Sequence, residues 1–168
     1  MAAETAKEAE MSENGSSRLA IIAAHGTLDL AYPPFILSTA AAAMDIESAI
    51  FFTFYGLNIL KKDHIDKLQV APLANPAMPM PVPNAIGVLP GMTAMATTMM
   101  NGMMEKANVA KLSELLEMAI DMGVRLIACQ MTMDVMGIKR EDLIADIEVG
   151  GAATFLEFAS HNAMTLSF

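Results

Sequence analysis

Short apolar runs alternate with segments of helical periodicity along this chain. The first run, Arg18–Ala24 (RLAIIAA), stops at residues 25–27 and predicts a buried strand at the centre of a sheet. In residues 28–44, apolar side chains then recur at helical spacing. Because Pro33 and Pro34 are tolerated only near a helix start or at a kink, we expect the regular helix to begin around Tyr32.

A second strand and a further helix continue the alternation. Ala49–Tyr55 (AIFFTFY) is rich in β-branched and aromatic residues and predicts a strand, and a short helix is expected after it over Leu57–Leu60 and Lys61-Lys62-Asp63. Lys111–Met122 has leucines at helical spacing and ends before Gly123, which is typical of a helix stop. It leads into Val124–Ala128, an apolar run that predicts a strand buried on both faces.

The helices and strands predicted in the C-terminal quarter are shorter than those before them. It predicts helical turns at 131–136 and 139–144, a brief strand at Asp146–Val149, an amphipathic helix after Gly150-Gly151, and a last edge strand at Met164–Phe168. Strands and helices in this order predict the α/β class, with a doubly wound, mostly parallel sheet of about five strands and helices on both faces.

An uncharged stretch interrupts the pattern between Leu68 and Met104. Its first half contains five prolines and predicts irregular structure, with a third strand at Ala85–Leu89. Met92–Met104 resumes a helical pattern and carries a stripe of methionines. Core or oligomer packing, an adaptable partner surface, and soft thioether metal ligation are three interpretations of such a stripe, in decreasing order of preference. We interpret the stretch as a flap or assembly surface, and we expect Pro90–Met104 at the carboxyl edge of the sheet, where it would cover the site as a flap or receive a docking protein. A membrane span is not favoured, because polar residues and prolines break the apolar run.

Composition and charge narrow the classes of function. The 168 residues fit a single domain at 18–168, and residues 1–17, with four glutamates against Lys7, predict a mobile acidic tail. A net charge of −9 argues against nucleic-acid binding, which needs a basic face. The hydrophobic content of 54% predicts that apolar surface is hidden in a homo-oligomer, with Met92–Met104 among the shielded elements. One cysteine allows no internal disulfide, and a reducing cytoplasm is the expected compartment.

The single cysteine, Cys129, is the candidate for chemistry. It lies where the Val124–Ala128 strand gives way to a helical turn, so it is expected at the carboxyl edge of the sheet, where ligands bind in open α/β folds. A thiol beside a helix N-terminus is favoured as thiolate. The alternative is an inert, buried core cysteine. The three histidines are too scattered for a metal motif, so no metal or other cofactor is expected, and His25 stands out only because it should share the sheet edge with Cys129.

Three segments resemble one known family. GTLDLAYPP at Gly26–Pro34, AIFFTFYGLNIL at Ala49–Leu60 and IACQMTMDVMGI at Ile127–Ile138 are similar to the DsrE-like branch of the DsrE/DsrF/DsrH family of sulfurtransferases and sulfur carriers. The resemblance implies a flavodoxin-like fold, a homo-oligomer, and a cysteine that carries sulfane sulfur as a persulfide or thiosulfonate for relay to other sulfur proteins. Some relatives carry a second cysteine, which this chain lacks.

The site implied by the resemblance is centred on Cys129 as the sulfur-bearing nucleophile. Small sulfur compounds such as thiosulfate or polysulfide are the expected donors. Neighbouring residues predicted to bind the substrate are Gln130, Met131, Thr132, Met133, His25, Gly26, Tyr55 and Asn58. A non-catalytic, oligomeric or membrane-peripheral scaffold, with Cys129 as packing alone, remains the alternative. Whether the protein turns over as an enzyme or only carries sulfur stays open.

Overall fold

The computed structural model describes residues 18–71 and 91–168, and these form a five-stranded parallel sheet with helices on both faces. The strand order is β4-β3-β2-β1-β5, and all four neighbouring pairs are parallel. The α/β class, the parallel sheet and the number of strands are therefore as predicted. The strands are β1 Arg18–Ala23, β2 Glu47–Phe52, β3 Arg125–Cys129, β4 Glu148–Gly150 and β5 Ala163–Ser167.

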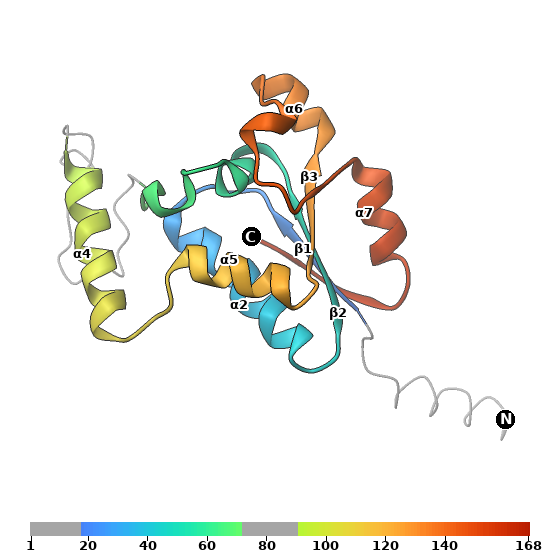
Figure 1. Cartoon of the computed structure of the whole chain (residues 1–168), viewed down its shortest axis with the longest axis horizontal. Helices are drawn as coiled ribbons and strands as arrows, with labels where there is room; N and C mark the ends of the chain where they lie inside the picture. Colours follow the sequence, from blue (N-terminus) through green and yellow to red (C-terminus); the bar gives the residue numbers. More distant parts are fainter. Residues whose placement is uncertain (1–17, 72–90) are drawn as a thin grey trace, which may run out of the picture.

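The helices lie in two layers against this sheet (Figure 1). Helices α2 and α5 cover one face, and α7 covers the other, while α6 lies beyond the carboxyl end of β3. The bounds are α2 Leu28–Ala42, α4 Met92–Lys106, α5 Leu112–Asp121, α6 Gln130–Met136 and α7 Ala152–Ala159, with short 3-10 helices η1 Phe54–Leu60, η2 Ile65–Lys67 and η3 Arg140–Asp142.

Alternate residues of each central strand pack on opposite faces of the sheet. In β1, Leu19 and Ile21 belong to the larger core cluster, which α2 and α5 complete, whereas Ala20 belongs to a smaller cluster that Phe155 and Phe158 of α7 complete. Strands buried on both faces appear in a sequence as continuous apolar runs, which is why the sequence pattern identified them. The position of β1 was predicted less well, because β2 occupies the centre and β1 lies between β2 and the edge strand β5.

Helix α2 begins at Leu28, one turn earlier than the prolines led us to predict. The Leu28 N–H donates to the Gln69 carbonyl at 2.9 Å, and the Ala31 N–H donates to the Thr27 carbonyl at 3.0 Å, so the first turn is closed before the prolines. Pro33 and Pro34 then lie inside the helix and leave two carbonyls without intrahelical donors. Pro34 is buried in the core, and its packing offsets part of this loss.

Strand β2 ends at Phe52, three residues before the predicted end. Phe54 has φ of +45°, which turns the chain out of the strand and into η1. At this turn the chain after β1 touches the chain after β2 so closely that side chains are excluded. A Cβ on Gly26 would lie 2.1 Å from the Tyr55 carbonyl oxygen, and one on Gly56 would lie 2.0 Å from the Ala23 carbonyl oxygen.

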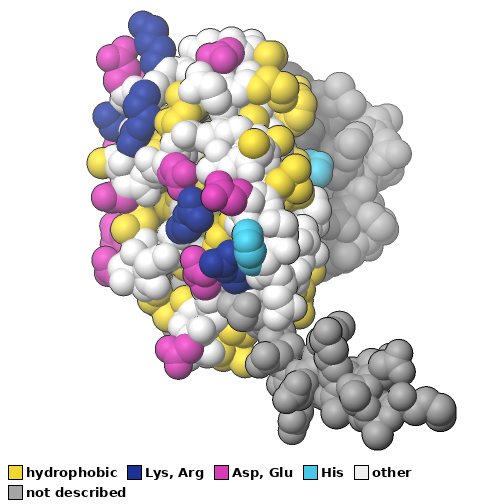
Figure 2. Space-filling view, turned by 90° about the vertical axis from the view of Figure 1, so that its right-hand side faces the viewer, with side chains coloured by type: hydrophobic (Ala, Val, Ile, Leu, Met, Phe, Trp, Pro, Cys, Tyr) yellow, Lys and Arg dark blue, Asp and Glu magenta, His cyan; other side chains and the backbone are white. Residues whose placement is uncertain are grey.

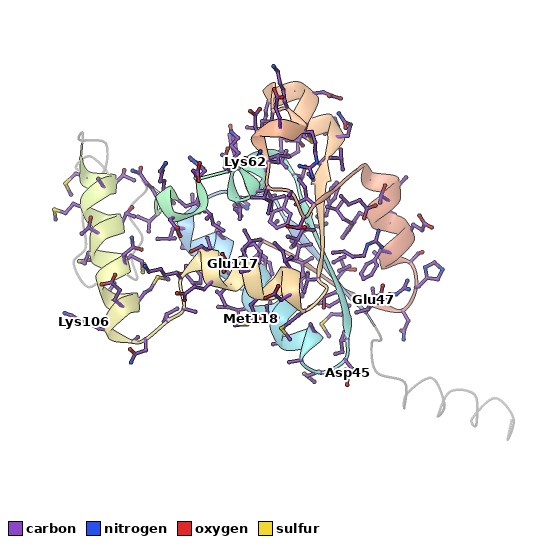
Figure 3. All side chains as sticks on the ribbon, in the orientation of Figure 1. Asp45, Glu47, Lys62, Lys106, Glu117 and Met118 are labelled. Carbon is purple, nitrogen blue, oxygen red and sulfur yellow. The ribbon has the colours of Figure 1, made fainter. Side chains whose placement is uncertain are left out.

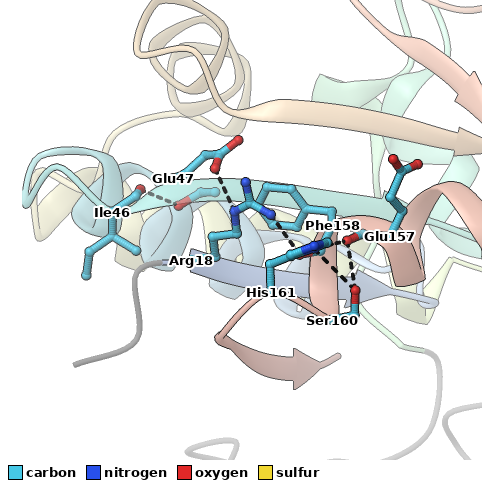
Figure 4. Close-up of polar contacts among 8 residues, drawn as sticks. Arg18, Ile46, Glu47, Glu157, Phe158, Ser160 and His161 are labelled. Atoms are coloured by element: carbon cyan, nitrogen blue, oxygen red, sulfur yellow. Dashed lines mark hydrogen bonds and ion pairs between the residues drawn. The ribbon is translucent and has the colours of Figure 1, made fainter. Parts of the chain in front are cut away.

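The amino edge of the sheet is held by two arginines (Figure 4 shows one of them). Arg18 forms an ion pair with Glu47 at 2.7 Å and places its guanidinium 5.0 Å from the centre of the Phe158 ring. Arg125 pairs with Glu148 at 2.7 Å and lies over the same ring at 5.5 Å. Phe158 of α7 therefore anchors the starts of two strands, at the end of the sheet opposite Cys129.

The methionine-rich helix α4 does not cover the carboxyl edge as the predicted flap would. Figure 1 places it at the far left, beyond η2 and the start of α5 and away from α6. Met100 and Met104 pack against the larger core cluster, and the Thr97 hydroxyl accepts from the Val70 N–H at 3.2 Å. Met95, Met99 and Met103 are exposed. In the ranges that the structure describes, no helix is long and apolar enough to cross a bilayer.

Two predictions fall outside the described residues, namely the tail at 1–17 and the strand at Ala85–Leu89. The brief strand predicted at Asp146–Val149 is present as β4, shifted by two residues at its start. The last edge strand is present as β5.

Candidate functional site

Cys129 is the last residue of β3 and the residue that precedes the first turn of α6. Its side chain packs in the smaller core cluster, and only 5% of its surface is exposed. It pairs in register with Gly150, so the start of α7 lies directly beside it. The sheet-edge position predicted for this thiol is the one observed, but burial alone would make it inert. The polar groups around the sulfur decide its reactivity.

A pair of buried hydroxyls lies next to the thiol. The Oγ1 atoms of Thr53 and Thr132 are 3.1 Å apart, and the Thr132 hydroxyl also accepts from the Phe54 N–H at 3.1 Å. Thr53 follows β2, and Thr132 lies in the first turn of α6, so the pair links two neighbouring strand ends. Because Thr132 accepts from Phe54, its own proton remains available to Thr53 or to the sulfur.

These groups lower the pKa of Cys129. Burial acts first and raises the pKa, because a thiolate loses hydration in the interior. The hydroxyl and N–H of Thr132, the hydroxyl of Thr53 and the N–H of Met131 act in the other direction, and together they outweigh burial. The neutral thiol closes no side-chain cap on α6, since a thiol is a weak acceptor. A thiolate is a much better acceptor for the same donors, and the site therefore favours the anion.

Large apolar side chains are exposed on the two elements that follow β2 and β3. Phe54 and Tyr55 of η1, and Met131 and Val135 of α6, are each more than half exposed, although they carry large apolar groups. Figure 2 shows hydrophobic side chains gathered at the upper right of the face that it presents, whereas charged side chains occupy its centre and left. We call Phe54, Tyr55, Met131 and Val135 the apolar collar. Exposed apolar side chains that gather on one surface are typical of a site that binds another molecule.

The predicted neighbours on the strand ends have different roles. His25 follows β1 and is exposed; β2 separates β1 from β3, so His25 lies about two strand spacings, or roughly 10 Å, from the chain at Cys129. Gly26 is required for packing against Tyr55, as described above. Asn58 is half-buried in η1 beside Gly26. Tyr55 alone of these four contributes an exposed side chain to the apolar collar.

The substrate-binding residues predicted after Cys129 are also partly buried and partly exposed. Thr132 is fully buried and contacts Thr53, whereas Met131 is exposed in the collar. Gln130 donates to Asp134 at 2.8 Å along the outer surface of α6. Met133, which was also predicted to bind the substrate, is buried in the larger core cluster and does not belong to the apolar collar.

Sequence reasoning missed Thr53 and Phe54. A threonine that ends a wholly apolar strand, here Phe51-Phe52-Thr53, was the available signal, since a polar residue at that point reaches the carboxyl edge. The strained backbone of Phe54 gave no signal in the sequence, because its positive φ is imposed by tertiary contacts. Among the described residues, no group of three or more His, Cys, Asp or Glu side chains is arranged to hold a metal ion.

The fold and the site define an α/β protein with a single thiol of lowered pKa at the carboxyl edge of a parallel sheet. Residues 15–167 match the DsrE/DsrF/DrsH-like family, and the chain belongs to this family. It is 46% identical over 155 residues to the sulfur carrier protein DsrE2 of Allochromatium vinosum, an alignment that covers 89% of this chain and 96% of that protein.

Two further comparisons also match the chain over most of its length. The chain is 32% identical over 154 residues to the uncharacterized protein YrkE of Bacillus subtilis, covering 90% of this chain and 96% of that protein. The structure of MTH1491, a protein of unknown function from Methanobacterium thermoautotrophicum, superposes with a TM-score of 0.52 at 11% identity and covers 90% of this chain and 98% of that one. This likeness concerns the fold alone.

Proposed function

We propose that this protein is a sulfur carrier that binds sulfane sulfur on Cys129 and passes it to a partner protein in sulfur metabolism. The single observation that carries the proposal is the placement of a buried thiol at the carboxyl end of β3, next to the paired hydroxyls of Thr53 and Thr132, and these donors lower its pKa. The name of the relative from Allochromatium vinosum supports the same role. The single cysteine, which allows no internal disulfide, supports a cytoplasmic setting.

The loading step is a thiolate displacement at sulfur. With a persulfide donor, the Cys129 thiolate attacks the outer sulfur, a new S–S bond forms, the donor S–S bond breaks, and the donor leaves as a thiolate. With thiosulfate, the thiolate attacks the outer sulfur and sulfite leaves, so that the charge of −3 is the same on both sides. Neither reaction requires an external oxidant or reductant. Release to an acceptor thiolate is the same displacement in reverse.

The hydroxyl pair stabilises the anion both before and after sulfur is loaded. The Thr53 and Thr132 hydroxyls and the N–H groups of Met131 and Thr132 stabilise the thiolate before loading and the terminal sulfur anion after it. The net charge of −9 does not attract anionic donors, so local donors rather than overall charge favour binding. Low exposure of Cys129 protects the loaded sulfur from water.

The apolar collar suits a protein acceptor. The collar is formed by two elements, with Phe54 and Tyr55 on η1 and Met131 and Val135 on α6. A partner protein that binds to both elements would bring its own thiol close to Cys129. Aromatic residues and methionine are enriched where proteins bind one another, and methionine adapts to different partners. We propose this collar as the docking surface for other sulfur-relay proteins.

Intact-mass spectrometry tests the proposal. The reduced native protein is incubated with thiosulfate or polysulfide, and loading adds about 32 Da per sulfane sulfur atom. Tetrathionate, used as a third donor, should instead leave a larger thiosulfonate adduct on Cys129 while thiosulfate departs. Cys129→Ser, a near-isosteric control, should gain nothing under the same conditions. A thiol that stays unmodified in the native protein, yet reacts once the protein is unfolded, would contradict the proposal and leave Cys129 as a packing residue in a scaffold.

A further inference from the structure

Helix α4 carries two groups of methionines that have different surroundings. Met100 and Met104 are partly buried and pack against the larger core cluster. Met95, Met99 and Met103, here called the outer methionine row, are 60%, 38% and 39% exposed. No residue of α4, all of which the structure describes, is fully buried. Core packing therefore explains Met100 and Met104 but not the outer methionine row.

The spacing of the outer methionine row places neighbouring thioethers within reach of one another. Residues four positions apart on a helix lie one above the other, with about 5–6 Å between their Cβ atoms. Met99 therefore has one thioether neighbour before it, Met95, and one after it, Met103. Met92 continues the row toward the helix start but is partly buried. Because the methionine side chain is long and flexible, two neighbouring thioethers can turn toward a single ion between them.

The residues beside the outer methionine row leave its sulfur atoms open to solvent. Ala96 and Gly102 flank the row, and a Cβ added to Gly102 would meet no atom within 4 Å. Surfaces that bind proteins are enriched in aromatic residues and arginine. Helix α4 contains neither, whereas the apolar collar includes Phe54 and Tyr55. The row therefore offers sulfur ligands rather than the contact residues of a protein interface.

The chemistry of the thioether selects the ion. Thioether sulfur is soft, and soft ligands of this kind select Cu(I). A neutral thioether does not replace the thiolates that hold Zn²⁺ or iron–sulfur clusters. No charged or titratable side chain lies between Met92 and Met104, so the row contains no carboxylate, imidazole or thiol that would favour another ion. Glu105 and Lys106 follow at the helix end with opposite charges.

We propose that the outer methionine row is a Cu(I) site, in which the thioether of Met99 holds the ion together with that of Met95 or Met103. The site is separate from the thiol, since α4 lies far from α6 in Figure 1. A thiolate is also a soft ligand, so the site is tested in a Cys129→Ser background. This variant cannot carry sulfur but keeps the whole row. The proposal is therefore independent of the sulfur-carrier function.

Competition for Cu(I) tests the site. Full-length Cys129→Ser is titrated in the absence of oxygen with the coloured complex of Cu(I) and bicinchoninate, which loses absorbance as the protein takes up the ion. We expect uptake of about one Cu(I) per chain. Met95→Leu/Met99→Leu/Met103→Leu, in the same background, keeps side-chain size and net charge and should lose this uptake. A parent that takes up no Cu(I), or a triple variant that takes up as much as the parent, would overturn the proposal.

Two methionines of α5 provide a matched control. Met118 and Met122 are 46% and 39% exposed and are also four positions apart. Figure 3 shows Met118 on α5, apart from Lys106 at the end of α4. Met118→Leu/Met122→Leu should therefore take up Cu(I) as the parent does. If this variant loses the uptake instead, the ion binds at α5 and the assignment to the outer methionine row is wrong.

Single substitutions test the central position of Met99. Met99→Leu leaves Met95 and Met103 about 12 Å apart along the helix axis, too far to share an ion, and should lose the uptake. Met95→Leu and Met103→Leu each leave one neighbouring pair and should keep a weaker site. Methionine-methyl NMR with Ag(I), a redox-stable substitute for Cu(I), locates the ion directly. Shifts confined to methionines outside the row, or equal uptake by all three single variants, would overturn this arrangement.

Discussion

The hydroxyl oxygens of Thr53 and Thr132 lie 3.1 Å apart, although 79 positions separate the two residues in the sequence. Thr53 follows the second strand and Thr132 lies in the first turn of α6, so their contact links the carboxyl ends of the neighbouring strands β2 and β3 next to Cys129. Both hydroxyls act on the same sulfur. The lowered pKa of the thiol thus depends on the contact between two segments rather than on either segment alone.

Loss of the Thr132 hydroxyl should affect both reactivity and stability. Thr132→Val keeps the shape of the side chain but removes a donor to the sulfur and leaves the Phe54 N–H without its acceptor. We expect a higher pKa for Cys129 and a free energy of unfolding lower by about 1–3 kcal/mol. Iodoacetamide alkylation against pH and urea denaturation measure the two effects. Thr53→Val, which keeps the bond from Phe54, should cost less, and equal losses in both variants would contradict this assignment.

The lowered pKa of Cys129 predicts a pH-dependent stability with a definite sign. The folded protein favours the thiolate, so its contribution to the free energy of unfolding is fully present above the unfolded pKa of about 8.5 and is lost as the pH falls through the folded pKa. The stability of wild type relative to Cys129→Ser should therefore rise with pH across this window. Urea denaturation of both proteins from neutral to alkaline pH measures it. A difference that stays flat or falls would contradict the lowered pKa.

Gly26, which follows β1, and Gly56 of η1 lie where these two segments touch, and neither position should tolerate a side chain. In Gly26→Ala and Gly56→Ala the new Cβ would overlap a backbone carbonyl oxygen at 2.1 Å and 2.0 Å, and backbone cannot move aside cheaply. We expect each variant to lose about 2–3 kcal/mol or more of folding free energy. Gly102→Ala in α4 is the control. Its Cβ meets nothing within 4 Å, so the variant should be more stable by about 0.5–1 kcal/mol.

Phe54 should be under backbone strain. Its φ of +45° is unfavourable for a residue with a side chain, and its ring is largely exposed, so little burial energy is lost on truncation. Phe54→Gly should therefore be more stable than Phe54→Ala by about 1 kcal/mol in thermal or chemical denaturation. Both variants should load sulfur from a small donor as wild type does but transfer it more slowly to a protein acceptor, because the apolar collar is incomplete. Equal transfer rates would exclude Phe54 from docking.

The methionines of α4 should not take part in sulfur loading. Met95 and Met99 are exposed on a helix that lies far from α6, whereas the sequence had suggested a flap over the thiol. Met95→Glu/Met99→Glu should therefore load from thiosulfate or polysulfide at the wild-type rate, as intact-mass spectrometry measures it. Met131→Glu, in the apolar collar, is the contrasting variant and should alter loading or transfer. A loading defect in the α4 variant would restore the flap.

The sequence determined the elements whose own residues specify their structure. Continuous apolar runs identified β1 and β3 because strands buried on both faces carry no polar alternation, and leucine periodicity identified α5. The order of these elements predicted the parallel sheet and placed Cys129 at its carboxyl edge. These features are local, or follow from connectivity, and therefore appear in a single sequence.

Tertiary structure decided what depends on contacts between distant segments. The start of α2 is set by a bond from Leu28 to Gln69, the turn at Phe54 by its bond to Thr132, and the pKa of Cys129 by the meeting of Thr53 with Thr132. The position of α4 away from the thiol depends on how Met100 and Met104 pack. Propensity and periodicity report only on neighbours along the chain, so none of these contacts could be read from the sequence.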